Sequence, residues 1–148
     1  MPSIRSPFGN TATLATADAL TGTVDNSQIL NLKGAAGALI AVLNLGTAGT
    51  TGIDIIEFSR DGGITWAACT AANVGKGYAG LLRLSDQTVV TSAALEAAGI
   101  EPVTVATHFF FLPAPDGPFH IRCARGGAGA GGTAWTTGAP VVVATRIG

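Results

Sequence analysis

Charge is scarce in this sequence, and the few charged side chains are scattered along it. Charged residues make up 11% of the 148 residues, against roughly 25% in an average soluble domain. The eight Lys and Arg residues form no cluster and the net charge is −1, so we expect no direct nucleic-acid binding. A mean hydropathy of +0.44 predicts a surface that partners partly cover. Alternatively, small residues raise this value without forming apolar patches.

Long apolar runs are also missing. A membrane-spanning helix needs about 20 apolar residues, whereas the longest comparable stretch, residues 35–43, has nine. The first 20 residues contain no apolar segment typical of a signal peptide. We therefore expect no membrane partner and synthesis in a cytoplasm.

Cysteine is nearly absent. Cys69 and Cys123 lie far apart and have no C-x-x-C spacing, so we expect reduced, buried thiols. A disulfide that forms later, in a released particle, is the alternative.

The sequence does contain many short alternating or apolar segments separated by turn residues, which predicts strands. Residues 91–98 are expected to form one brief helix, and residues 71–80 a loop. No internal repeat is present, so a propeller or solenoid is not expected. The sequence predicts an all-β, antiparallel, jelly-roll-like β-sandwich. Its expected strands are residues 20–24, 28–32, 38–44, 53–60, 64–68, 81–84, 103–112, 119–125, 133–137 and 141–147.

The chain divides into an extended N-terminal arm, residues 1–18, and a single β-sandwich domain, residues 19–148. The arm is rich in Ser, Thr, Ala, Asn and Pro and shows no clear period. Either it becomes ordered on a neighbouring subunit, or it is simply disordered.

One motif is specific. The segment SRDGGITW matches S-x-D-x-G-x-T-W and resembles the Asp-box, a β-hairpin element of sialidases and many unrelated β proteins. Asp accepts hydrogen bonds from turn amides, Gly allows positive φ, and Trp packs over the hairpin. Sialidases are longer and carry several boxes, so the resemblance, over eight residues, implies only a structural turn. Its expected residues are Ser59, Asp61, Gly63, Thr65 and Trp66.

No residue set predicts catalysis or a cofactor. Glycosidases need paired carboxylates, yet Asp54 and Glu57 fall on opposite faces of a regular strand. The nucleophile elbow G-x-S-x-G is absent. His120 and Cys123, three apart on one strand, also point to opposite faces, so we expect no metal site with His108. The chain is therefore predicted not to be an enzyme.

Aromatic residues point instead to an interface. Phe109, Phe110 and Phe111 are consecutive, so both faces of their strand need cover. Either a neighbouring subunit or a loop of the same chain covers the outer face. Trp135, in a Gly- and Thr-rich tract, either stacks on a sugar or closes the end of the sandwich.

The whole-chain pattern is similar to small bacteriophage virion proteins. The likeness lies in the Thr-, Ala- and Asn-containing arm and in the segments ALIAVLNLGTAGTTGIDIIEFSRDGGITWAA and PFHIRCARGGAGAGGTAW. The resemblance implies a jelly-roll-like subunit, often a trimer, that binds the major capsid protein or other virion proteins and stabilises the shell. Its location would be the virion.

The sequence therefore predicts a capsid decoration (cement) protein. The alternatives are another virion component, such as a head fibre or tail adaptor, or a carbohydrate-binding module for host attachment that uses Trp135 or Tyr78.

Overall fold

The computed structural model describes residues 11–15, 29–43, 54–75, 77–85, 87–89, 107–125 and 141–148. These residues form ten strands and one four-residue helix, α1. The elements are β1 (Thr11–Ala15), β2 (Leu30–Asn31), β3 (Gly37–Leu43), β4 (Asp54–Ser59), β5 (Ala67–Ala68), α1 (Ala71–Val74), β6 (Leu82–Arg83), β7 (Thr88–Val89), β8 (Thr107–Pro113), β9 (His120–Arg125) and β10 (Val141–Ile147).

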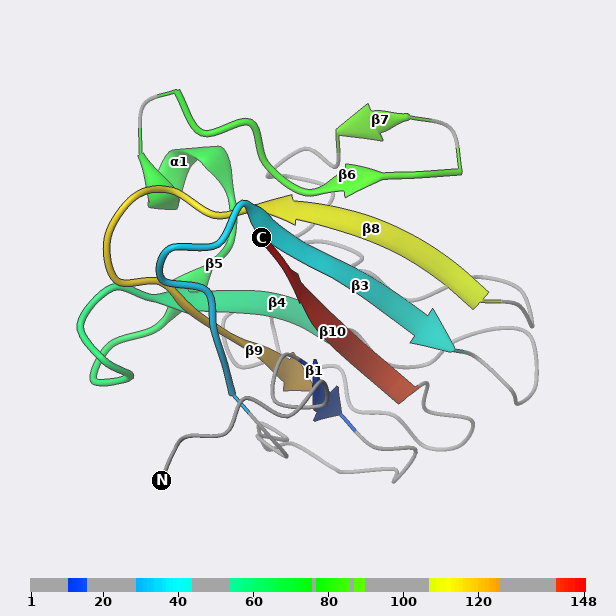
Figure 1. The fold of residues 1–148 in the computed structure, drawn as a ribbon, viewed down its shortest axis with the longest axis horizontal. Helices are drawn as coiled ribbons and strands as arrows, with labels where there is room; N and C mark the ends of the chain where they lie inside the picture. Colours follow the sequence, from blue (N-terminus) through cyan, green and yellow to red (C-terminus); the bar gives the residue numbers. More distant parts are fainter. Residues whose placement is uncertain are drawn as a thin grey trace.

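The strands form two antiparallel sheets. Sheet A has the order β1-β10-β3-β8-β6-β7, and sheet B has the order β2-β9-β4-β5. In Figure 1, β8, β3 and β10 of sheet A lie side by side, and β10 passes in front of the end of β4 of sheet B. The prediction of an all-β antiparallel sandwich is confirmed, whereas the jelly-roll connectivity stays a prediction.

The core follows from the two-residue period of the strands. Ile40 on β3 and Val142 on β10 point inward from sheet A and are fully buried. On β9, Ile121 and Cys123 are fully buried, while Arg122 between them keeps some exposure. This alternation is the one that the sequence predicts for residues 119–125. It brings the apolar sides of the two sheets together as one cluster.

Strand β4 is an exception because both of its faces are buried. Ile56 and Phe58 enter the core between the sheets, yet Ile55 and Glu57, which alternate with them, are also buried. A buried carboxylate needs a partner, and Arg122 on β9 provides it for Glu57.

Residues 11–15 belong to the sandwich and not to a separate arm. They form β1 at the edge of sheet A, paired with β10, and Ala12 and Leu14 join the core. The arm prediction is therefore wrong for these five residues. The segment is too short for its alternation of side chains to be recognised in the sequence. The strand forms because it pairs with a segment about 130 residues away.

Residues 71–80 are not a loop throughout, because α1 occupies the first four. Thr70 caps this helical turn by accepting a hydrogen bond from the Asn73 amide, and the Asn73 side chain donates to the Ala68 carbonyl. Strand β8 also continues through Pro113, which pairs with Gly37, before the chain turns. The predicted strands 20–24 and 133–137, and the predicted helix 91–98, lie outside the described residues.

Candidate functional site

The turn between β4 and β5 is closed by its own side chains. Ser59 Oγ accepts from the Gly63 amide at 2.8 Å and donates to Asp61 Oδ1 at 2.7 Å. Asp61 Oδ1 also accepts from the amides of Ile64 and Thr65, at 3.1 and 2.9 Å. Gly63 adopts a φ of +95°, which glycine allows without strain. The five motif residues thus hold a rigid loop.

These contacts set the charge state of Asp61. The Thr65 hydroxyl donates to Oδ2, and this bond is the main reason that the pKa of Asp61 lies well below its usual range. The Thr65 amide and the Ser59 hydroxyl lower this pKa further. An ionised carboxylate that already accepts four hydrogen bonds is a poor proton donor, so Asp61 fits a structural role.

Trp66 closes the hairpin and covers a buried ion pair. Its indole N–H donates to the Gly63 carbonyl at 3.0 Å, and the Arg122 guanidinium lies 4.2 Å from its ring centre. Arg122 in turn binds Glu57 Oε1 through Nη2 at 2.8 Å and through Nε at 2.9 Å. The pairing of β4 with β9 brings these two side chains together, because Glu57 lies directly opposite Arg122. The sequence did not predict this pair, which needs the pairing of β4 with β9.

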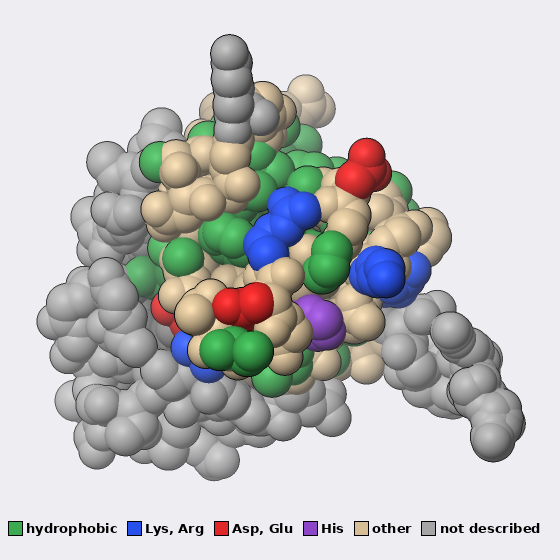
Figure 2. Space-filling model, turned by 90° about the vertical axis from the view of Figure 1, so that its left-hand side faces the viewer, with side chains coloured by type: hydrophobic (Ala, Val, Ile, Leu, Met, Phe, Trp, Pro, Cys, Tyr) green, Lys and Arg blue, Asp and Glu red, His purple; other side chains and the backbone are tan. Residues whose placement is uncertain are grey.

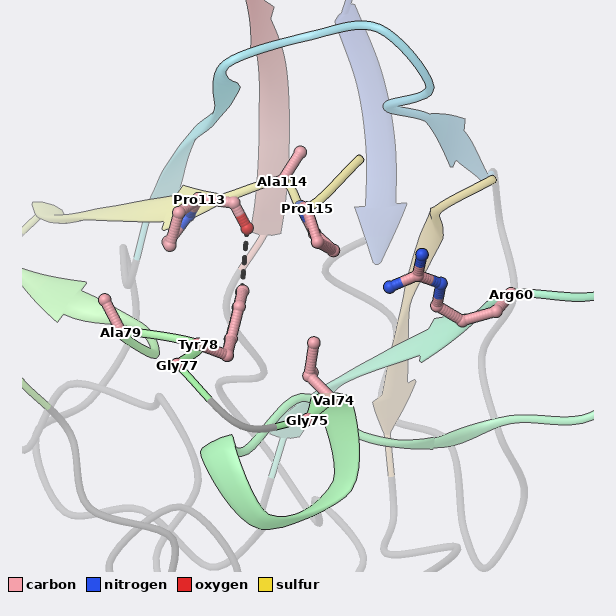
Figure 3. A pocket seen from close by; sticks show the side chains of 9 residues that line it. All are labelled: Arg60, Val74, Gly75, Gly77, Tyr78, Ala79, Pro113, Ala114 and Pro115. Atoms are coloured by element: carbon pink, nitrogen blue, oxygen red, sulfur yellow. Dashed lines mark hydrogen bonds between the residues drawn. The ribbon is translucent and has the colours of Figure 1, made fainter. Parts of the chain in front are cut away.

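One end of the sandwich carries a hollow of about 390 Å³. Tyr78 and Val74 form one wall, Pro113 to Pro115 form the other, and the Arg60 guanidinium lies at its side (Figure 3). The Tyr78 hydroxyl donates to the Pro113 carbonyl at 2.8 Å, and its ring lies against Phe119. Tyr78 therefore braces the hollow, and sugar binding through Tyr78 stays a prediction.

This end of the molecule has mixed chemistry. Figure 2 shows cationic and acidic side chains there, interspersed with hydrophobic ones. Arg60 lines both this hollow and a smaller one of about 320 Å³ beside Trp66. One Arg60 nitrogen donates to the Asp116 carbonyl at 2.6 Å. The exposed Ile64 side chain projects from the hairpin turn.

The cysteines and histidines do not form a reactive group. Cys69 and Cys123 are buried thiols, and burial raises the pKa of the Cys69 thiol to about 12. His108 lies in sheet A and His120 in sheet B. His108 Nε2 and His120 Nδ1 are buried without a hydrogen-bond partner. Within the described ranges, no three His, Cys, Asp or Glu residues gather where they could hold a metal ion.

The three consecutive phenylalanines divide between the two faces of sheet A. Phe110 points into the core and is 4% exposed, whereas Phe109 points outward and is 45% exposed. Phe111 also points outward and is half-buried. Trp135, the other aromatic candidate, lies outside the described residues.

Strand register extends this outward surface across sheet A. One row of paired residues runs from Leu39 through Phe111 and Leu82 to Val89. A neighbouring row joins Val143, Ala41 and Phe109. We call the outward side of β10, β3, β8, β6 and β7 the apolar face. Its members are Leu39, Ala41, Leu43, Leu82, Val89, Phe109, Phe111, Val141, Val143, Thr145 and Ile147.

Charged side chains on these strands lie on the other side. Arg83 is opposite the inward-facing Phe110, and Arg146 is opposite the inward-facing Ala38. Arg146 reaches across the end of the sandwich and donates to the Asn31 carbonyl at 3.0 Å. The apolar face, as far as the described residues define it, therefore carries no charged side chain. From the sequence, only the phenylalanines could be assigned to an outward surface. The other members of the face come together only through the order in which the strands pair.

Comparison with known proteins finds no matching family model, no matching curated protein and no matching solved structure. None of the helices in the described part of the chain is long and apolar enough to cross a membrane. Among the surfaces of the described residues, the apolar face is the one that most suits contact with a partner.

Proposed function

We propose that the chain is a structural virion protein of the decoration or cement type, which binds the outer capsid surface and stabilises the shell. The observation that carries the assembly part of the proposal, a subunit that associates through an apolar surface, is the apolar face. Contiguous exposed apolar patches on soluble monomers rarely exceed a few hundred Å², and larger ones mark interaction sites. Phe109, Val89 and Ile147 are each more than 40% exposed in three different rows of this face, and its other members keep partial exposure, which supports an interaction surface here.

The other features of the molecule agree with a structural role. The turn at Asp61 uses its polar groups internally, and the Glu57–Arg122 pair is sealed under Trp66. Neither arrangement leaves an acid and a base converging on an open space. The resemblance of residues 38–68 and 118–135 to phage virion proteins supports placing this subunit on a capsid, with the major capsid protein or other virion proteins as partners.

Copy number in purified particles tests the proposal. Particles would be isolated from a bacterial lysate in which the chain is produced, and the chain would be quantified by mass spectrometry relative to the major capsid protein. A decoration protein is expected at a fixed, high ratio to the shell subunit. A few copies per particle would indicate a head fibre or tail adaptor instead, and absence from the particles would refute a virion role.

A further inference from the structure

We propose that the apolar face packs against another copy of this chain, so that the protein is a homo-oligomer held together by sheet A. This inference rests on the proposed assembly role and names the partner of one surface. It concerns residues that strand register brings into two adjoining rows, with Phe109 and Phe111 near their middle.

The absence of charge favours a copy of the same chain over a different protein. Interfaces between unlike proteins commonly gain orientation and specificity from complementary charges. The apolar face offers none, because Arg83 and Arg146 lie on the opposite side of sheet A. When two copies meet through the same surface about a two-fold axis, each side chain of the face meets side chains of that same face on the other copy. A neutral face can do so without repulsion between like charges.

The face has the size of a weak, reversible interface. Strands β3, β8 and β10 each have seven residues. At about 4.8 Å between strands and about 3.3 Å per residue, they and the two-residue strands β6 and β7 span roughly 400 Å². Two such faces supply about 800 Å² before side-chain relief is added, which is below the roughly 1,000 Å² of a stable specific interface and in the range of weak association.

Shape points the same way. Sheets pack face to face about 10 Å apart when the facing side chains are apolar. The outward side of sheet A offers branched and aromatic groups such as Leu39, Val143 and Phe111, each of which keeps part of its surface exposed. The charged end of the sandwich, with Arg60 and Asp61, is left free for contacts of another kind.

The test is the mass of the purified full chain in solution, measured by analytical ultracentrifugation at up to about 100 µM, a range that detects weak association. The wild type is expected to be a dimer, because a face that packs against the same face of another copy closes at two copies. F109K and V89K each place a cation on the apolar face and are expected to raise the dissociation constant by about 30-fold or more. Both side chains are substantially exposed, so circular dichroism should show a native fold.

The matched control is I64K, which makes the same kind of change at an 82% exposed position on the hairpin turn. This variant is expected to keep the wild-type mass. A monomeric wild type, or folded F109K and V89K variants that both keep the wild-type mass, would overturn the inference. If either face variant fails to fold, the other gives the result.

The outcome is separable from the test of the proposed function. A monomer in solution that is still abundant on purified particles would refute self-association and leave the decoration role standing. An oligomer that the face variants dissolve, but that is absent from particles, would support the contact and refute the virion role.

Discussion

At Asp61, one carboxylate organises the whole turn between β4 and β5. Its oxygens accept hydrogen bonds from Ser59, Ile64 and Thr65, and those from Thr65 contribute most to lowering its pKa. Because the pKa is lower in the folded than in the unfolded chain, the ionised group stabilises the fold at neutral pH. This stabilisation is complete above the unfolded pKa of about 4 and is lost as the pH falls toward the folded pKa.

The D61N variant tests this account. An amide keeps one acceptor oxygen but loses the negative charge and the acceptor for the Thr65 hydroxyl, so we expect a lower melting temperature at pH 7. The gap to the wild type should narrow below about pH 4, where the wild-type carboxylate begins to lose its advantage. Thermal melts followed by circular dichroism from neutral to acid pH measure this.

The matched control for this variant is D116N, because Asp116 accepts a hydrogen bond from Arg60 through its backbone carbonyl and not through its side chain. We expect D116N to melt like the wild type at neutral pH. If the difference in melting temperature between D61N and the wild type stays constant as the pH falls, the charge of Asp61 does not stabilise the fold as described.

A second residue-scale prediction concerns the Glu57–Arg122 pair. Removing only Arg122 leaves a buried carboxylate without a partner, so R122M should lower the free energy of unfolding by about 2–3 kcal/mol. The double variant E57M/R122M removes both charges and should cost less than R122M alone. Urea denaturation of the single and double variants measures the difference. A double variant that loses the sum of its two single losses would rule out the coupling.

At the scale of elements, the sequence predicted what is local. The hairpin could be expected because its five specified residues lie within eight positions and bond to one another. Strand β9 could be expected from its alternation. Strand β1 could not, because it depends on pairing with β10 at the far end of the chain. The apolar face also depends on pairing between distant strands, so the sequence predicted only its phenylalanines.

One close approach between elements gives a third prediction. Gly37 opens β3 opposite β8, and a Cβ there would lie 2.2 Å from the Leu112 carbonyl oxygen. G37A should therefore separate the two strands at this point and cost about 1–3 kcal/mol in the free energy of unfolding. Chemical denaturation gives the cost, and backbone amide shifts in NMR spectra locate the change.

G62A is the control for that experiment, because a Cβ at Gly62 meets no atom within 4 Å, although φ is +75°. G62A should lower the free energy of unfolding by about 1–2 kcal/mol through backbone conformation alone. Its changes in amide chemical shift should stay within the turn. Unchanged amide shifts in β3 and β8 of G37A would show that the close approach does not matter for strand pairing.

At the scale of the whole molecule, the apolar face and the charged end of the sandwich suit different kinds of contact. The neutral side of sheet A suits contact between copies, whereas the end of the sandwich carries Arg60, the hollow beside Tyr78 and the exposed Ile64. A subunit with one self-associating surface and one mixed surface can join neighbours and a shell at once. Binding of this kind stabilises the bound state by mass action.

The most direct test of the central claim is the disruption temperature of purified shells, measured by calorimetry with and without saturating amounts of the chain. A protein that binds only intact shells raises the free energy needed to disrupt them, by about 2.7 kcal/mol per site at 100 times its dissociation constant. We predict a disruption temperature that rises with the concentration of the chain and, above the dissociation constant, keeps rising with the logarithm of that concentration. A temperature that stays the same at every concentration would contradict the account.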